Sequence, residues 1–240
     1  MSSVAQRWHA AALGGLLIAA IACGVLSSMP DIDAPDYFER LAAIETGIIV
    51  AALFQVAMAL AYAGVIAFTF PLVRAASQTA AMAYLTLRTI GASFLFMGVV
   101  ALLLFTVIGD GLRTAASPEQ LADYAFAAEM LRQGRDWLNH VGMILPWATG
   151  GVLLYWALWR LAAVPRWLAF AGLVGAALTL IATILYIAGQ IEVVSAPYLA
   201  LNAPAALAEI VLALTLIVRG YDPGSVALVE ATVSRADLRS

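Results

Sequence analysis

The chain has 240 residues, of which 64% are apolar and only 11% are charged, and its formal net charge is −3. Soluble domains carry about a quarter charged residues, so this composition excludes an ordinary soluble globular protein. The chain has no lysine and no run of arginines, so we expect no nucleic acid among its partners.

Six long apolar stretches follow one another along the chain. A transmembrane helix needs about 20 apolar residues, and each stretch is long enough. The predicted fold is therefore all-α, a polytopic membrane bundle of six transmembrane helices within residues 1–220, followed by a short cytoplasmic tail at 221–240. We expect Pro71 to end the second helix. The predicted helices cover approximately residues 9–29, 44–72, 79–109, 137–160, 164–189 and 198–219.

Two of the connections between these stretches carry helix signals of their own. Residues 31–40 read as a turn and then a short interfacial helix. Ser117 followed by Pro118 is typical of a helix start, and the apolar residues beyond them recur at helical spacing. This pattern predicts a short amphipathic helix on the outer surface between helices three and four. It would act either as a plain connector or as a lid over a cavity.

The arginines indicate how the bundle is oriented. Positive residues collect in cytoplasmic loops. If the N-terminus is inside, seven arginines lie on the inner side, whereas the outer connections hold most of the acidic residues. We therefore expect a multi-pass protein of the cell (cytoplasmic) membrane with both termini cytoplasmic. The seven inner arginines are Arg7, Arg74, Arg160, Arg166, Arg219, Arg235 and Arg239.

Two charged residues lie deep inside predicted spans. Arg88 is nine residues beyond the inner start of helix three, and Glu209 is ten residues before Arg219 at the inner end of helix six. At 1.5 Å per residue both lie roughly 13–15 Å from the inner surface. Equal depth and opposite charge suggest an Arg88–Glu209 pair. It would be either a staple that fixes helix packing or part of a site for a ligand or a proton.

A second polar group is predicted near the outer ends of the helices. Asp136 and His140 are four residues apart on helix four, Glu45 opens helix two and Asn202 begins helix six. These four side chains could line an outward-opening pocket, in which Asp136 would bond to His140. The alternative is ordinary polarity at helix ends.

Two further positions concern the scaffold and the cofactors. Gln55 lies near mid-membrane and is expected to form a hydrogen bond between helices. Pro146 should interrupt the backbone hydrogen bonds of helix four. His9 and His140 lie at opposite ends of the membrane, so we expect no haem, metal or other cofactor.

Several motifs, taken in order, resemble a bacterial membrane family known as domain of unknown function 4386. The resemblance covers nearly the whole chain, implies six membrane helices and supplies no activity. It places Arg88, His140 and Glu209 on motif positions. The matching segments are Arg7 with the Gly-rich first helix, Tyr84-Leu85-Thr86-Leu87-Arg88, His140-Val141-Gly142 followed by Tyr155 and Arg160, Pro165-Arg166-Trp167-Leu168, Pro204-Ala205-Ala206-Leu207-Ala208-Glu209 and Leu216-Ile217-Val218-Arg219-Gly220.

Three functions remain open at this point. The first is binding or movement of a small amphiphile, lipid or proton-coupled solute in a cavity between the helices. The candidate ligand-binding residues are Arg88, Glu209, His140, Glu45, Asn202, Asp136 and Gln55. The second, less favoured, is an intramembrane enzyme that uses His140 with a carboxylate. The third is a structural or partner-binding subunit. The lipid bilayer is the expected partner, and the sequence sets no oligomeric state.

Overall fold

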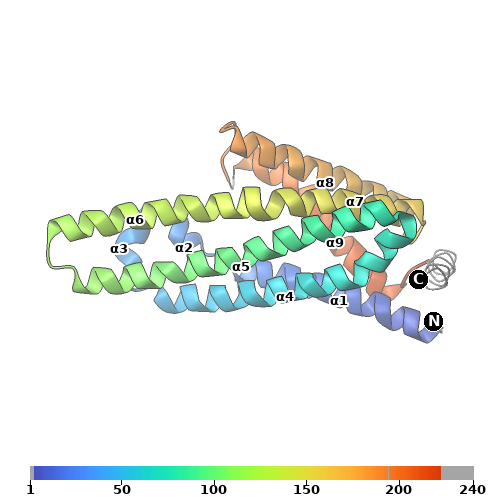
Figure 1. Ribbon diagram of the computed structural model, residues 1–240, viewed down its shortest axis with the longest axis horizontal. Helices are drawn as coiled ribbons and strands as arrows, with labels where there is room; N and C mark the ends of the chain where they lie inside the picture. The colour runs from blue at the N-terminus through green and yellow to red at the C-terminus, as the bar shows by residue number, and fades with distance from the viewer. Residues whose placement is uncertain (1–2, 194, 223–240) are drawn as a thin grey trace.

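The computed structural model describes residues 3–193 and 195–222, and the regular elements within them are all helical (Figure 1). Six of the helical segments are long and apolar enough to cross a membrane, which confirms the predicted count. The elements are α1 (Ser3–Leu26), α2 (Pro30–Asp33), α3 (Tyr37–Arg40), α4 (Glu45–Ala76), α5 (Gln78–Thr114), α6 (Pro118–Trp137), the π-helix η1 (Leu138–Ile144), α7 (Leu145–Arg160), α8 (Arg166–Ile187) and α9 (Ala196–Val218).

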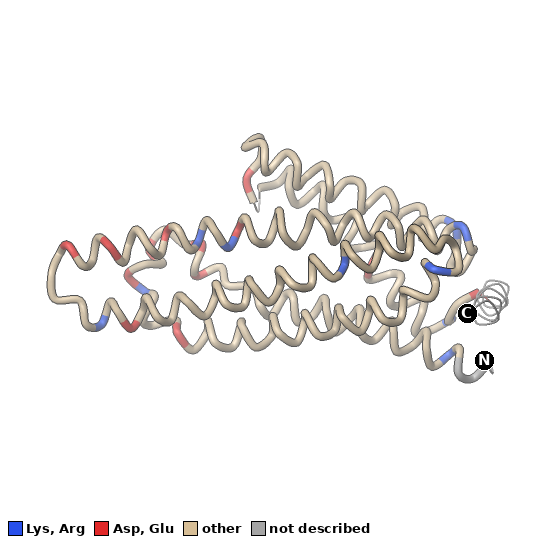
Figure 2. Tube along the Cα trace, viewed as in Figure 1, with Lys and Arg blue, Asp and Glu red and all other residues tan. Residues whose placement is uncertain are grey.

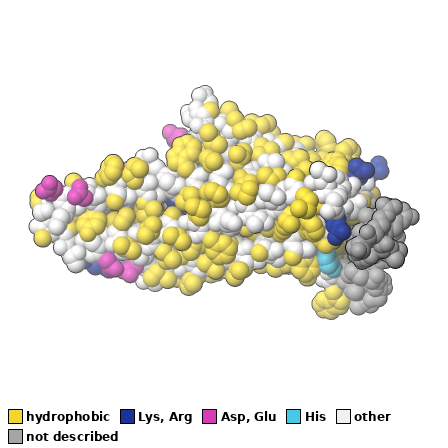
Figure 3. All heavy atoms as spheres, viewed as in Figure 1, with side chains coloured by type: hydrophobic (Ala, Val, Ile, Leu, Met, Phe, Trp, Pro, Cys, Tyr) yellow, Lys and Arg dark blue, Asp and Glu magenta, His cyan; other side chains and the backbone are white. Residues whose placement is uncertain are grey.

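The membrane-crossing helices form a closed ring. Each packs on its neighbour in the order α1, α4, α5, α7, α8, α9, and α9 returns to pack on α1. The two ends of the described chain therefore lie at the same end of the bundle (Figure 1). Apolar side chains cover the middle of the face seen in Figure 3, and charged side chains lie toward its two ends. This distribution fits a bundle that crosses a bilayer.

The helix expected between spans three and four is present, and it begins where the sequence predicts. The side-chain oxygen of Ser117 accepts a hydrogen bond from the backbone N–H of Gln120 at 3.2 Å, and Pro118 is the first helical residue. It does not lie along a surface. It runs in line through η1 into α7, and no proline lies between Pro118 and Pro146 to interrupt it (Figure 1).

The continuous helix is much longer than a bilayer core. Its 43 residues span about 65 Å, against about 30 Å of hydrocarbon. With the end of α5 it forms a hairpin at one end of the bundle, where most of the described acidic residues lie (Figure 2). The hairpin therefore extends beyond the membrane. The Tyr37 hydroxyl of α3 donates to a Glu129 carboxylate oxygen of α6 at 3.3 Å. Burial of the hydroxyl raises the pKa of Tyr37, and the negative charge of Glu129 raises it further.

Two prolines inside helices have different outcomes. The prediction that Pro71 ends the second helix is wrong, since α4 continues through it to Ala76 and packs on α1 and α5. Pro146, in contrast, follows a real break in the α-helical pattern. Just before it, the N–H of Leu145 donates to the carbonyl of His140, five residues back. A proline has no N–H for the usual bond, and the chain accommodates this with a π-helical segment.

Candidate functional site

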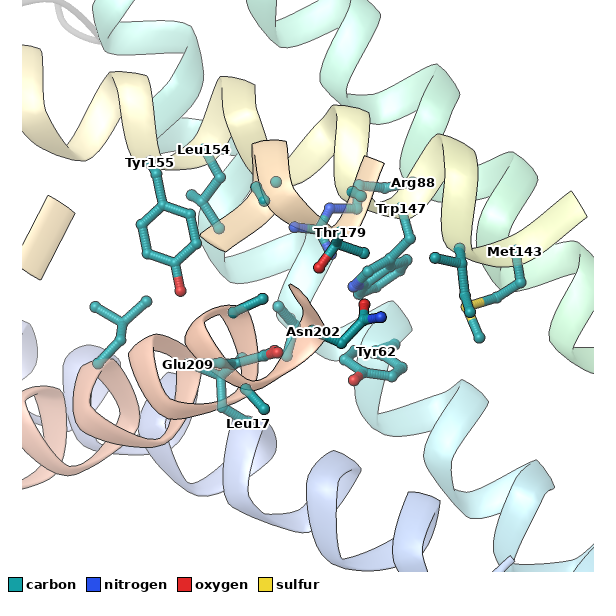
Figure 4. Close-up of a pocket in the computed structure, with 18 of the residues that line it drawn as sticks. Leu17, Tyr62, Arg88, Met143, Trp147, Leu154, Tyr155, Thr179, Asn202 and Glu209 are labelled. Carbon is teal, nitrogen blue, oxygen red and sulfur yellow. The ribbon is translucent and has the colours of Figure 1, made fainter. Parts of the chain in front are cut away.

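A cavity of about 290 Å³ lies inside the ring (Figure 4). Every helix of the ring contributes to its wall, so the cavity is a property of the whole bundle. Most of the wall is apolar, with a few polar groups among the apolar side chains. The residues that carry the argument below are Tyr62 of α4, Arg88 of α5, Trp147 and Tyr155 of α7, Thr179 of α8, and Asn202 and Glu209 of α9.

Arg88 packs between aromatic rings and against a glycine of the neighbouring helix α7. It is only 4% exposed. Its guanidinium carbon lies 3.8 Å from the centroid of the Trp147 ring and 5.4 Å from that of Tyr84. Gly150 of α7 leaves room for its stem, because a Cβ there would stand 3.0 Å from Arg88 Nε. These contacts orient the cation, but they supply no hydrogen-bond acceptor.

The guanidinium of Arg88 has no hydrogen-bond partner among the described residues. Its Nε atom is fully buried without an acceptor. Such unpaired buried groups are rare, and each calls for a water, an ion or a ligand as partner.

Glu209 lies on the wall of the same cavity. The two residues that the sequence places at equal depth, Arg88 and Glu209, therefore lie on the wall of one cavity. A direct pair is not formed, because the described part of the chain contains no contact within 4.0 Å between the two charged groups. The carboxylate of Glu209 likewise makes no hydrogen bond to a described residue. The two charges thus share one cavity without contact.

Further polar groups line the cavity, and of these only Asn202 was predicted from the sequence. The Thr179 hydroxyl is buried and has no partner among the described residues. The hydroxyls of Tyr62 and Tyr155 form no hydrogen bond with the described residues either, and that of Tyr155 is directed toward α9 in Figure 4. Asn202 donates through Nδ2 to the carbonyl of Tyr198 at 2.9 Å. The sequence signal for both tyrosines was a phenol in the middle of an apolar helix, and Tyr155 also belongs to the fourth-helix pattern that resembles the family.

His140 has a separate environment. It is 1% exposed and packs against the Tyr186 ring at 4.1 Å between centroids. Its Nδ1 lies 2.8 Å from the backbone carbonyl of Asp136, and its Nε2 lies 3.0 Å from the Tyr198 hydroxyl. A carbonyl can only accept, so Nδ1 donates and, in the neutral ring, Nε2 accepts from Tyr198. The carboxylate of Asp136 is not its partner.

The outer polar residues do not meet in one pocket. Glu45 forms an ion pair with Arg113 at 2.7 Å, where both side chains are partly exposed. Asn202 lines the inner cavity, whereas His140 does not. Gln55 behaves as expected from the sequence, since its Nε2 donates to the Leu95 carbonyl of α5 at 3.2 Å. Within residues 3–193 and 195–222, no three histidine, cysteine or acidic side chains are grouped to hold a metal ion.

A ring of six apolar helices defines the class of this chain as a multi-pass, all-helical membrane protein. Residues 12–220 match the family described as domain of unknown function (DUF4386), and the chain belongs to that family. No curated protein and no solved structure matches it. The family description names no activity, so the function has to be argued from the cavity.

Proposed function

We propose that this protein binds, or moves across the membrane, a small amphiphile, lipid or proton-coupled solute in the cavity between its helices. The observation that carries the proposal is the presence of Arg88 and Glu209 on one cavity wall, both without a partner among the described residues. His140, Glu45 and Asp136 have no part in this site.

The energetic argument starts from the cost of a buried charge. A charged residue at the centre of a membrane helix costs about 2.5–3.5 kcal/mol. The stack of Arg88 on Trp147 offsets about 0.5–2 kcal/mol of this. A direct ion pair would offset more, but the two groups remain apart. An arrangement that leaves both charges facing a cavity is suited to a ligand that supplies the missing bonds.

The size of the cavity restricts the ligand. Ligand pockets in proteins run from about 300 to 1,000 Å³, and this cavity of about 290 Å³ is at the lower limit. This favours a small solute or one polar headgroup over a whole lipid. A cavity-free bundle would instead favour a structural role, and an enzyme based on His140 would need that ring on the cavity wall.

Native mass spectrometry of protein purified in a mild detergent tests the proposal. The wild type should carry a bound mass, and R88Q should lose it. The matched control is R160Q, because Arg160 also lies over a tryptophan ring, at 5.4 Å from Trp156, but is exposed at a helix end. An unliganded wild type, or equal retention of the bound mass in R88Q and R160Q, would contradict the proposal.

We also propose that both termini face the cytoplasm. The turn between α7 and α8, which Arg160 and Arg166 flank, lies at the end of the bundle where α1 begins and α9 ends, opposite the acidic hairpin (Figure 1). Arg235 and Arg239 lie outside the described residues. In a Cys23→Ala background, a membrane-impermeant maleimide added to intact cells should label Ala116→Cys and spare Gln78→Cys. The reverse labelling pattern would overturn this orientation.

A further inference from the structure

The cavity contains one group of each charge, and neither group forms a hydrogen bond to a described residue. Arg88 provides donors only, and Glu209, when ionised, provides acceptors only. With both ionised the pair has no net charge, and the two groups stay more than 4.0 Å apart. Arg88 therefore lacks an acceptor, for which an anion is the strongest match, and Glu209 lacks a donor, for which a cation is the strongest match.

Charge balance narrows the ligand further. A simple anion would satisfy Arg88 but would add net negative charge close to Glu209. A simple cation would do the opposite. In a site enclosed by membrane helices either excess is costly, because uncompensated charge is poorly screened there. A ligand that carries both charges satisfies both residues and leaves the site neutral.

We infer, on the basis of the proposed function, that the ligand is a small zwitterion whose anionic group binds Arg88 and whose ammonium group binds Glu209. The cavity size fits such a molecule, with its two charges a few bonds apart.

The anionic end has a second donor in reach. A Cβ on Gly151 would lie 3.6 Å from Arg88 Nη2 and 3.5 Å from the Ala176 Cβ, so α8 approaches the guanidinium at Ala176. Thr179 is one helical turn further along α8 on the same face, and its hydroxyl is buried without a partner among the described residues. Arg88 and Thr179 together form a donor pair of the kind that carboxylates bind.

The cationic end is lined by aromatic residues. Tyr62 and Tyr155 lie on the cavity wall with Glu209, and the Tyr62 ring packs on Trp147 at 4.2 Å between centroids (Figure 4). Tyrosine faces attract cations, and their hydroxyl oxygens can accept from an ammonium group. Glu209 and the two tyrosines therefore form the complementary half of the site.

A series of four-carbon probes tests the inference on the purified wild-type protein. Binding of 2-aminobutanoate, 4-aminobutanoate, butanoate and butylammonium is measured by calorimetry at constant ionic strength and pH 7. At least one aminobutanoate should bind about tenfold or more tighter than butanoate and butylammonium, since each single-charge probe leaves one buried partner unmatched. R88Q and E209Q should each weaken that binding about tenfold or more, and R160Q should leave it unchanged.

The possible outcomes separate this inference from the proposed function. If butanoate binds as tightly as the better aminobutanoate and E209Q has no effect, the site is an anion site and the zwitterion is wrong. If no probe binds but the wild type retains a native ligand mass, the small zwitterion is wrong and the proposed function stands. If no probe binds and native mass spectrometry of the wild type shows no bound ligand, the zwitterion inference and the proposed function are both wrong. The wild-type comparison needs no variant, so a misfolded R88Q leaves the test intact.

Discussion

Replacement of Arg88 by methionine separates a binding role from a purely structural one by the sign of its effect on stability. Arg88 costs about 2.5–3.5 kcal/mol as a charge at mid-helix. Its stack on Trp147 at 3.8 Å returns about 0.5–2 kcal/mol, and no ion pair with a described residue adds to this. Methionine fills a similar volume without charge. R88M should therefore raise the free energy of unfolding by about 0.5–3 kcal/mol in ligand-free protein, while it abolishes ligand binding.

The opposite result follows if Arg88 is a staple. Removal of one partner from a buried ion pair typically costs about 3–5 kcal/mol, because the other charge is left unpaired. The free energy is measured by titration of mixed micelles with a denaturing detergent, with helix content followed by circular dichroism. R160M, at an exposed arginine, should stay within about 0.5 kcal/mol of the wild type. A loss of 3 kcal/mol or more in R88M that E209Q restores in the double variant would refute the reasoning.

Four other substitutions, one of them a control, test helix packing and the outer ion pair. Gly172→Ala should lower the free energy of unfolding by about 1–3 kcal/mol, because the added Cβ would overlap the Tyr155 ring. Gly134→Ala is the control, since open space surrounds that position, and it should raise the free energy of unfolding by up to about 1 kcal/mol. Equal effects of the two substitutions in the same titration would contradict the packing. Gln55→Leu removes the interhelical bond to Leu95 and should cost about 0.6–2 kcal/mol in that assay, so unchanged stability would show that the bond contributes nothing. Arg113→Gln breaks a partly exposed ion pair with Glu45 and should lower the free energy of unfolding only slightly, an effect that vanishes in 1 M salt. A loss of stability that persists in 1 M salt would indicate a buried pair.

The existence of the six spans could be predicted because apolar length alone marks a membrane helix. Their ends could not, because local propensity was overruled by packing. Gly109 and Gly111 lie where the apolar run of α5 ends, yet the helix continues to Thr114. Gly109 accommodates the backbone of Ala42, and Gly111 packs against the Tyr124 ring of α6, so close contacts keep both glycines helical. The helix α4 also continues through Pro71, against the local preference of proline.

The candidate site was only half visible in the sequence. Depth from the membrane surface identified Arg88 and Glu209, since charge at mid-span is costly and therefore conspicuous. Thr179, Tyr62 and Tyr155 were not identified as site residues. A threonine hydroxyl in a helix usually bonds to the backbone of its own helix, as that of Thr183 does to the carbonyl of Thr179, so a threonine does not by itself indicate a site. Which of them faces the cavity depends on how each helix is rotated in the ring. The predicted bond between His140 and the Asp136 carboxylate is wrong. A spacing of four residues in a helix also brings the backbone carbonyl of Asp136 within reach of the ring, and that carbonyl is the partner.

An experimental density map of the purified protein in lipid nanodiscs tests the central claim most directly. The account predicts non-protein density in the cavity, in contact with the Arg88 guanidinium, with Arg88 and Glu209 still separated by more than 4.0 Å. A closed cavity, with the guanidinium bonded directly to the Glu209 carboxylate and no density between them, would contradict it.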